Sequence, residues 1–253
     1  MRLVPSGAVL VTGASGGIGR GIALRFAAAG APVVVHYRGD AAGAAGTVTL
    51  IEREGGSAHA VRGDLSTEEG CRAVVDEAAA WCGGGLGALV NNAAAQPVQP
   101  LPGMTEGEWR AVVDTNLTSV FACTQAAVPL LVESGGGSVT HLASIEAANP
   151  APGHAHYSAS KAAVIAHARA AALEYGPRGV RVNAVSPGLV ERPGLAAQWP
   201  EGVRRWQAAA PGGRLVRAEE VADACVFLAS PLAAGINGHN LVVDRGVSAR
   251  PTW

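Results

Sequence analysis

The order of apolar and helical segments constrains the fold of this chain more than any other feature. Short apolar runs alternate with longer segments of helical composition from beginning to end. The runs are rich in Val and Leu without polar alternation, as expected of strands covered on both faces. They lie at Ala8–Val11, Pro32–Tyr37, Ala58–Arg62, Ala88–Asn91, Ser138–Leu142, Arg181–Ser186 and Asn240–Val243.

The composition of the intervening segments predicts helices at Gly17–Ala29, Ala41–Glu54, Thr67–Cys82, Glu106–Glu133, Tyr157–Tyr175 and Ala218–Ala229. Alternation of strands and helices implies a parallel sheet with helices on both faces. No shift of composition marks a domain boundary. The sequence therefore predicts a single α/β domain over residues 1–253, a Rossmann-type doubly wound parallel sheet of about seven strands.

One segment interrupts the alternation. Residues 189–215 follow the sixth predicted strand and contain three prolines and two tryptophans. A connection of this length is uncommon in a compact domain unless it is functional. In a doubly wound sheet it lies at the carboxyl edge, where ligands bind. We therefore expect residues 189–215 to form a substrate-binding flap within the domain.

The composition of the chain excludes several classes of function. The chain is 49% hydrophobic, and its net charge of −1 argues against a nucleic-acid binder or a basic membrane-surface protein. No run reaches the roughly 18 apolar residues of a membrane span, and the start lacks a signal segment. The four cysteines show no CxxC pair or metal spacing. We expect a cytoplasmic protein with reduced thiols, without a metal and without nucleic-acid or membrane partners.

A glycine-rich loop, TGASGGIG at residues 12–19, joins the first predicted strand to the first predicted helix. Glycines permit a tight turn and remove side chains where a pyrophosphate approaches. The helix N-terminus adds unpaired N–H groups for the phosphates. We therefore expect a dinucleotide cofactor at Gly13, Ser15, Gly17, Ile18 and Gly19.

The end of the second predicted strand indicates which cofactor binds. NAD is usually recognised there by an acidic residue, but the sequence continues as His36-Tyr37-Arg38 with no carboxylate before Asp40. A guanidinium at Arg38 is suited to clamp a 2′-phosphate. The sequence therefore favours NADP(H), with NAD(H) as the alternative.

Further polar residues follow the third and fourth predicted strands at the same edge. Asp64 is placed to accept from the adenine amino group, with Leu65 beside it. The asparagines of the NNAA stretch at 91–94 are placed to hold loop backbone together beside the cofactor, and we expect Asn91 and Ala93 to contact it. Each alone is equally typical of a turn. Their shared position makes cofactor binding the better interpretation.

Tyr157 and Lys161 begin the long helix after the fifth predicted strand, and their spacing of four places them on one helix face. Lys161 is the only lysine in the chain. A tyrosine has a pKa of about 10, so it needs assistance to act as a general acid or base near neutrality. We expect the Lys161 ammonium to lower that pKa by about 3 units, which corresponds to about 4 kcal/mol.

Two further residues complete a candidate catalytic group. Ser144 ends the fifth predicted strand, where its hydroxyl is placed to hydrogen-bond a substrate carbonyl as negative charge develops. Asn116 lies inside a predicted helix, although asparagine is a mediocre helix former. It is placed to hold a water that connects Lys161 to solvent, but taken alone Asn116 is better explained as an ordinary polar helix residue.

Together these motifs resemble the short-chain dehydrogenases/reductases in their single-domain form, over essentially the whole chain. The resemblance rests on TGASGGIG, Asp64, NNAA, Asn116, Ser144, YSASK at 157–161 and Pro187-Gly188, all in the family's order. It implies an NAD(P)-dependent oxidoreductase acting on CH–OH and C=O groups. It also implies a tetrad of Asn116, Ser144, Tyr157 and Lys161, in which Tyr157 donates or accepts the proton. Further implied cofactor contacts are Tyr157, Lys161, Pro187, Gly188 and Val190.

The sequence departs from the family at Arg192, where a threonine usually contacts the nicotinamide carboxamide. We expect backbone at Val190 to take over that contact. NNAA in place of the commoner NNAG is a smaller change. The glycine loop also fits the spacing of the sugar-epimerase branch, but the chain is too short for that branch's substrate domain.

Substrate specificity is expected from Glu146, from His154 and from the flap residues Trp199 and Trp206. The two tryptophans form either an apolar wall for a bulky ketone or only the packing of the flap. The sequence looks most like a 3-oxoacyl or polyketide-type ketoreductase. Residues 36–38 are also similar to pteridine reductases, although Ser144 stands where those enzymes tend to carry Asp.

Other functions remain alternatives at this stage, namely a sugar or polyol dehydrogenase and a non-catalytic NADP-binding sensor. We expect a small-molecule carbonyl or alcohol substrate, free or carrier-bound. The resemblance also implies a homo-oligomer, either a tetramer or a dimer.

Overall fold

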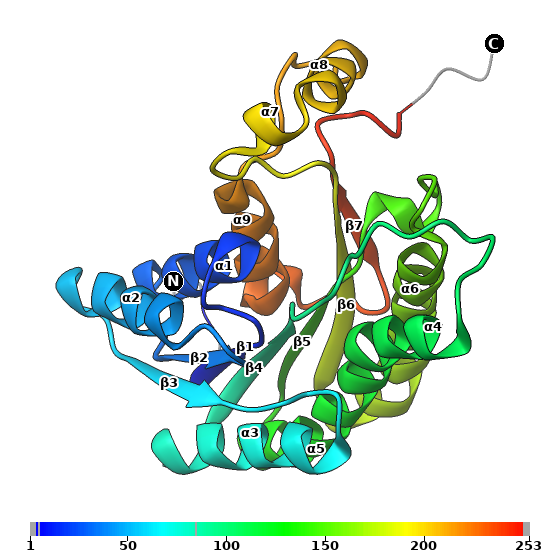
Figure 1. Ribbon diagram of the computed structural model, residues 1–253. Helices are drawn as coiled ribbons and strands as arrows, with labels where there is room; N and C mark the ends of the chain where they lie inside the picture. The colour runs from blue at the N-terminus through cyan, green and yellow to red at the C-terminus, as the bar shows by residue number, and fades with distance from the viewer. Residues whose placement is uncertain (1–3, 5, 84, 250–253) are drawn as a thin grey trace.

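Seven parallel strands form one central sheet in the computed structural model, which describes Val4, residues 6–83 and residues 85–249 (Figure 1). The strands are β1 (Ala8–Val11), β2 (Val33–Tyr37), β3 (Ala58–Arg62), β4 (Leu86–Asn91), β5 (Gly137–Leu142), β6 (Val180–Pro187) and β7 (Asn240–Val243). They lie in the order β3-β2-β1-β4-β5-β6-β7. The chain therefore changes direction across the sheet between β1 and β4, which is where ligands bind in this architecture.

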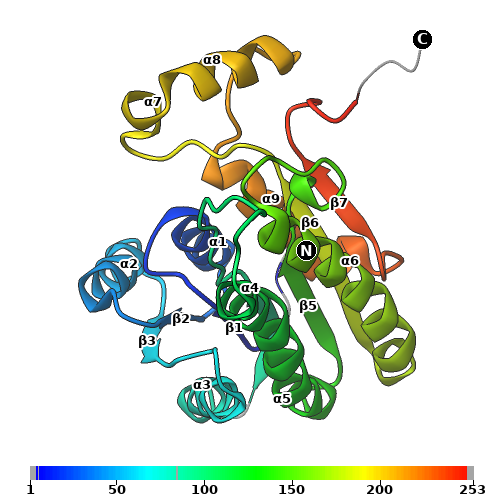
Figure 2. The same cartoon turned by 45° about the vertical axis from the view of Figure 1, so that its right-hand side comes forward.

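Helices cover both faces of the sheet (Figures 1 and 2). One layer holds α1 (Gly17–Ala28), α2 (Ala41–Arg53) and α9 (Ala218–Ala229), and the other holds α3 (Glu68–Trp81), α5 (Ser119–Glu133) and α6 (Ala155–Tyr175). Within β1, Val9 and Val11 enter the first core while Leu10 enters the second. Because successive side chains of a strand point to opposite faces, each strand needs an unbroken apolar run.

The predicted fold class is confirmed, and all seven strands lie within two residues of their predicted bounds. The prediction of one continuous helix over Glu106–Glu133 was wrong in one respect. The segment consists of α4 (Glu106–Val113), a π-helical turn at Asp114–Thr118, and α5. A π-turn inserts one residue into the helical repeat and often occurs at functional sites. Here it contains Asn116, whose side chain is fully buried.

The flap has secondary structure that the sequence did not predict. It contains α7 (Leu195–Gln198) and α8 (Pro200–Ala209), which lie beyond the carboxyl edge of the sheet (Figures 1 and 2). Proline suits the first turn of a helix because it lacks the N–H that would be unpaired there. The flap has its own small core of Leu195, Val203 and Leu215, against which Leu189 and Trp206 pack.

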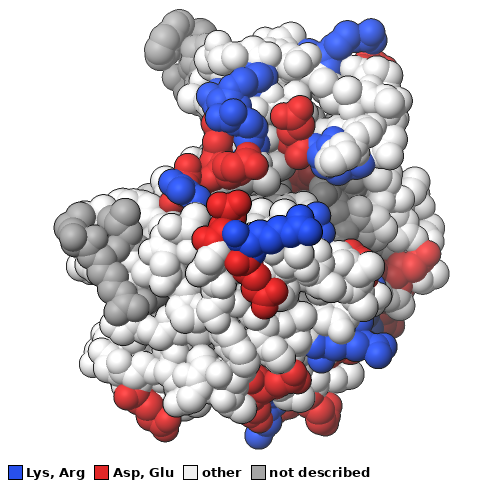
Figure 3. Space-filling view, turned by 90° about the vertical axis from the view of Figure 1, so that its left-hand side faces the viewer, with Lys and Arg blue, Asp and Glu red and all other residues white. Residues whose placement is uncertain are grey.

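One helical run, Glu106–Glu133, is long and apolar enough by length and composition to cross a membrane, and 50% of its most apolar window is buried inside the fold. Such burial is what a core helix requires. Three of the cysteines, Cys71, Cys123 and Cys225, are buried. Acidic and basic side chains intermingle on the face of the molecule in Figure 3. Among the ion pairs of the described residues, Glu220 accepts from both Arg214 and Arg245.

Candidate active site

Hydrogen bonds from the loop after β4 lock the glycine loop in place. The Thr12 hydroxyl oxygen accepts from the backbone N–H groups of Asn92, at 2.9 Å, and Ala93, at 3.0 Å. The Asn92 amide donates to the carbonyls of Thr12 (2.9 Å) and Gly13 (3.0 Å). The predicted role of the NNAA stretch in holding loop backbone is thus visible at Asn92. Ala93 lies within this unit.

The side chain of the first asparagine points elsewhere. Asn91 is buried, and its amide contacts the Thr124 hydroxyl at 3.2 Å and His141 Nδ1 at 3.2 Å. His141 Nε2 in turn lies 3.1 Å from His167 Nδ1. These groups form a polar network between the sheet and α5 and α6. Any cofactor contact at Asn91 therefore has to come from its backbone.

His36 fixes the glycine loop from the other side. The Gly13 N–H donates to His36 Nδ1 at 3.0 Å, and His36 Nε2 lies 3.2 Å from the Gly63 carbonyl. This pattern requires the neutral tautomer with its proton on Nε2. Burial lowers the pKa of His36, which favours the same neutral form. His36 is therefore a structural residue of the cofactor end.

Arg20 and Thr47 were missed by the sequence analysis. Arg20 donates to the Thr47 hydroxyl (2.9 Å) and to the carbonyls of Ser15 (2.5 Å) and Gly43 (3.0 Å). The Thr47 hydroxyl donates to Ala14 O at 3.0 Å. These bonds join the glycine loop to α2. The available signal was the position of Arg20 directly after the glycine motif.

The start of α1 fits a pyrophosphate. Its N-cap, Gly16, provides no side-chain cap for the first N–H groups of the helix. A Cβ atom at Gly16 or Gly17 would meet nothing within 4 Å, so open space lies in front of those N–H groups. A Cβ at Gly19 would lie 2.2 Å from Gly13 O, so only glycine allows this close packing. The predicted residue Ile18 is half-buried against the adjoining core.

The end of β2 presents a basic side chain and no available carboxylate. Arg38 is exposed there. The nearest carboxylate along the chain, Asp40, accepts from Gly43 N at 2.9 Å and so caps α2. Asp64 is exposed and accepts from Ser66 N at 3.0 Å; this bond, reinforced by the charge of Arg38, lowers the pKa of Asp64. Leu65 is buried in the core, which leaves its backbone for any ligand contact.

Tyr157 lies at the start of α6 with only 8% of its surface exposed. Burial raises its pKa to about 12, a side-chain hydrogen bond with Ser144 opposes this shift, and the charge of Glu146 adds to it. The structure therefore brings the predicted Ser144 hydroxyl to the Tyr157 hydroxyl.

Lys161 is buried one turn further along α6. Its Nζ donates to Leu142 O at 2.6 Å and lies 5.6 Å from the centroid of the Tyr157 ring. Burial lowers the pKa of Lys161 to about 8. The expected lowering of the Tyr157 pKa by Lys161 is wrong for this structure, because burial of the phenol is the largest cause of its shift and the ammonium is directed to a backbone carbonyl.

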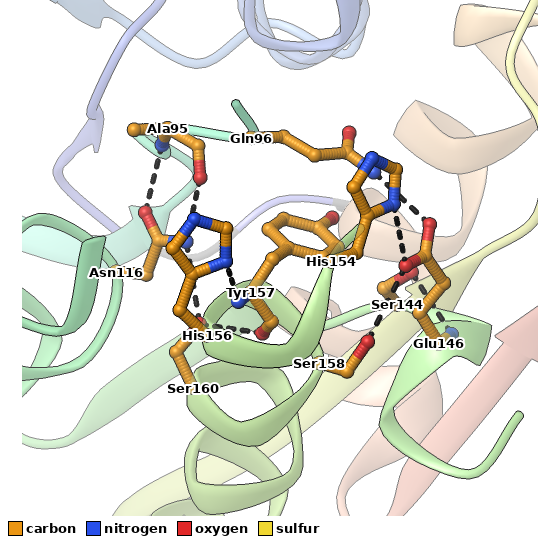
Figure 4. Close-up of polar contacts among 10 residues, drawn as sticks. All are labelled: Ala95, Gln96, Asn116, Ser144, Glu146, His154, His156, Tyr157, Ser158 and Ser160. Carbon is orange, nitrogen blue, oxygen red and sulfur yellow. Dashed lines mark hydrogen bonds and ion pairs between the residues drawn. The ribbon is translucent and has the colours of Figure 1, made fainter. Parts of the chain in front are cut away.

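Asn116 ties three elements together (Figure 4). Its carbonyl accepts from Ala95 N at 2.7 Å, and its amide donates to Ala95 O at 2.9 Å and to the Ser160 hydroxyl at 3.3 Å. Ser160 donates to Tyr157 O at 2.7 Å. Asn116 thus connects the loop after β4 to the backbone that carries Tyr157. Its water-holding role stays a prediction.

The two flap tryptophans differ. The Trp206 ring packs over Gly188, where a Cβ atom would lie 2.5 Å from Cη2, so this glycine makes room for the indole. Trp206 is therefore part of the flap packing, and its buried Nε1 has no hydrogen-bond partner among the described residues. Trp199 is 53% exposed. Pro187 ends β6, and Val190 forms a bridge with Val216 that closes the base of the flap.

Glu146 and His154, both predicted to face the substrate, are hydrogen-bonded beside Tyr157, with His154 Nδ1 2.9 Å from Glu146 Oε2 (Figure 4). Their side chains are 18% and 16% exposed. The tetrad residues, the glycine loop and this pair thus lie along one edge of the sheet.

A parallel sheet with this strand order and an open glycine-lined helix start defines an α/β protein that binds a dinucleotide. Residues 13–248 match the family model described as "Enoyl-(Acyl carrier protein) reductase". The chain is 40% identical over 246 residues to 3beta-hydroxysteroid dehydrogenase 1 of Eggerthella lenta, covering 96% of this chain and 94% of the relative. It is 37% identical over 238 residues to 3-oxoacyl-[acyl-carrier-protein] reductase FabG of Staphylococcus aureus, covering 94% and 96%.

A crystal structure assigned to a short-chain alcohol dehydrogenase of Sinorhizobium meliloti 1021 superposes with a TM-score of 0.93 at 36% identity, covering 99% of this chain and all of the other. The chain belongs to the short-chain dehydrogenase/reductase family. It is an oxidoreductase acting on alcohol and ketone groups, in a family that binds NAD or NADP.

Proposed function

We propose that this protein is an NADP(H)-dependent ketoreductase that interconverts a bulky, largely apolar ketone and its secondary alcohol. The observation that carries the proposal is the buried Tyr157 phenol at the start of α6, with Lys161 one helical turn away and its Nζ 5.6 Å from the centroid of the Tyr157 ring. At neutral pH this phenol is protonated, which is the form that gives a proton to a carbonyl oxygen.

The cofactor would be held by the glycine loop, by Arg38, and by the residues that follow β3, β4 and β6. A bound nicotinamide supplies or accepts the hydride. Ser144 donates a hydrogen bond to the substrate carbonyl oxygen as charge develops there, and Tyr157 protonates that oxygen. Lys161 orients the cofactor ribose and keeps positive charge near the phenol. Asn116 holds the backbone of Tyr157 through Ser160.

Two features support NADP(H) over NAD(H). Arg38 is exposed at the end of β2, where its guanidinium can reach a 2′-phosphate. Asp40 caps α2 by accepting from Gly43 N, and Tyr37, the last residue of β2, carries no carboxylate for a ribose 2′-hydroxyl.

The preference for a bulky apolar ketone is supported by the segments around the site. Val98 and Leu101, on the loop after β4, are 78% and 59% exposed, and Trp199 on the flap is 53% exposed. Exposed apolar side chains gathered near a site often mark ligand contact. A relative that shares 40% identity is named for a steroid alcohol.

A second candidate substrate is a carrier-bound 3-oxoacyl thioester. It is supported by the description of the matching family model and by the name of the Staphylococcus aureus relative.

The test is NADPH consumption, with NADH in parallel, over a panel of cyclic ketones, steroid ketones, 3-oxoacyl thioesters, pterins and sugars. We expect turnover with NADPH that falls by about 10²- to 10⁴-fold in Tyr157→Phe. Circular dichroism and melting temperature control for folding of the variant. Turnover with NADH alone contradicts the role of Arg38 and leaves the role of Tyr157 intact. Cofactor binding without any turnover favours an NADP-binding sensor and overturns the proposal.

A further inference from the structure

A polar cluster beside Tyr157 has more groups than the tetrad requires. It consists of Gln96, Glu146, His154 and Ser158 and is called here the Glu146 cluster (Figure 4). Glu146 Oε1 accepts from Gln96 Nε2 at 3.0 Å. Its Oε2 accepts from His154 Nδ1 at 2.9 Å and from the Ser158 hydroxyl at 3.4 Å. The carboxylate thus has a donor on each oxygen.

The cluster lies in the reaction site itself. The Ser144 hydroxyl accepts from Glu146 N at 3.1 Å, so the carboxylate belongs to the turn that positions this serine. The His154 ring stands edge-on to the Tyr157 ring, with centroids 6.0 Å apart and planes at 65°. His154 therefore borders the Tyr157 side chain, which carries the proposed proton donor.

One nitrogen of the His154 ring remains available to a ligand. An ionised carboxylate can only accept, so His154 Nδ1 must carry the proton that it donates to Glu146. A neutral imidazole in this tautomer presents a lone pair at Nε2. In the part of the chain that the structure describes, His154 Nε2 makes no hydrogen bond. The site therefore contains an oriented hydrogen-bond acceptor whose partner is not a described protein group.

The charge of Glu146 further limits the class of ligand that this site can accept. Its carboxylate raises the pKa of Tyr157 by Coulombic repulsion and so opposes formation of a phenolate. The same repulsion acts on any anionic substituent placed beside it. A carboxylate or phosphate on the substrate is thus disfavoured, whereas a neutral O–H donor is accepted.

From this arrangement we propose that His154 Nε2, oriented by Glu146, accepts a hydrogen bond from a hydroxyl group that the substrate carries in addition to its reacting carbonyl. The preferred substrates are then neutral hydroxyketones, and the corresponding diols in the oxidative direction. This inference rests on the proposed ketoreductase function, whose substrate class it refines.

The experiment compares cyclohexanone with its three positional hydroxy derivatives in the same buffer. We expect kcat/KM of the wild-type protein to be at least about tenfold higher for one hydroxy derivative than for cyclohexanone, because a site built to hydrogen-bond a substrate hydroxyl discriminates against the analogue that lacks it. In His154→Phe, which retains a ring against Tyr157, this ratio should fall to near one. Glu146→Gln, which loses the carboxylate that fixes the tautomer, should lower the ratio in the same direction.

The matched control is His59→Phe. His59 lies on β3, stacked on Trp81 with ring centroids 5.6 Å apart, far from the Glu146 cluster in the sheet order. This variant should keep the wild-type ratio. A wild-type ratio near one, or a ratio unchanged in His154→Phe, overturns the inference while the ketoreductase function stands.

If no ketone of the panel is reduced, binding measurements still test the acceptor role of His154 separately from the proposed ketoreductase function. Dissociation constants of the same four ketones are measured by ligand-observed NMR for the Tyr157→Phe protein, with and without NADPH. A preference for a hydroxy derivative that disappears when His154→Phe is added supports the acceptor role even if the proposed reaction is wrong. Equal binding of all four ketones refutes it.

Discussion

The glycine loop and the flap occupy the same edge of the sheet but are held in different ways. The loop is fixed by side chains of four other segments, through Asn92, His36, Thr47 and Arg20. The flap is attached by the Val190–Val216 bridge, by the Trp206 ring over Gly188 and by the Arg214–Glu220 ion pair, and its own core has three buried residues.

This difference matches the ligands that the two regions would receive. A dinucleotide offers the same phosphates and ribose to every member of the family, so its binding site can be rigid. Substrates vary, and loops with few anchoring contacts tolerate change and local opening. The flap even leaves the buried Trp206 Nε1 unpaired among the described residues, which marks it as the less optimised part of the edge.

The largest expected effect on stability comes from comparing a substitution in the core beside the glycine loop with one in the core of the flap. Phe26→Ala removes a fully buried ring behind the glycine loop and should lower the free energy of unfolding by about 3–5 kcal/mol. Leu195→Ala, in the flap core, should lower it by less than about 1 kcal/mol, because the flap can open without unfolding the sheet. Urea titrations measure both, and amide hydrogen exchange should report the opening of the flap. Equal losses for the two variants would contradict the comparison.

A smaller effect, on the pH dependence of stability, is expected from the lowered pKa of Lys161. Because burial lowers its pKa from 10.5 to about 8, the unfolded chain binds more protons than the folded chain between these values. The contribution of Lys161 to stability should therefore rise by about 2 kcal/mol from about pH 8 to about pH 10. The raised pKa of Tyr157 acts only above that window, where it lowers stability as pH rises to about 12. Denaturation curves of wild type and Lys161→Met over this range test the sign, since the gain should be absent in the variant.

Substitutions at two glycines test whether the glycine loop is rigid. Gly19→Ala places a Cβ atom 2.2 Å from Gly13 O and should cost about 2 kcal/mol of stability together with cofactor affinity. Gly16→Ala places its Cβ in open space and should leave the melting temperature unchanged, while NADPH binding weakens where the methyl group meets the pyrophosphate. Thermal unfolding and NADPH fluorescence titrations separate these outcomes. A stable Gly19→Ala protein would show that the loop is less rigid than its contacts indicate.

The smallest expected effect concerns cofactor choice. Arg38→Ala should reduce the preference for NADPH over NADH about tenfold, which corresponds to about 1.5 kcal/mol for a lost charge-assisted hydrogen bond. Because Arg38 is exposed, the melting temperature should not change. Ratios of kcat/KM for the two cofactors provide the measurement. An unchanged ratio would mean that a group other than Arg38 selects the cofactor.

Much of the cofactor end could be predicted because its signals are local. The apolar run of β1, the glycines that follow it and the helix after them are adjacent in the chain, and the four-residue spacing of Tyr157 and Lys161 fixes their common face. The clamp of His36 on Gly13 joins residues 23 positions apart and has no local signature. The π-turn at Asn116 likewise depends on its bonds to Ala95 and Ser160, which no helix propensity encodes.

By itself, the sequence determined the fold class and the strand positions, because hydrophobic periodicity acts within one element. It predicted the glycine loop and the tetrad through motifs that resemble those of the family. Only the tertiary structure decided that Trp206 packs over Gly188, that Asn91 turns away from the loop, and that Glu146 and His154 pair beside Tyr157. It also reversed the expected pKa shift of Tyr157, because burial is a property of everything packed around the phenol and not of its neighbours along the helix.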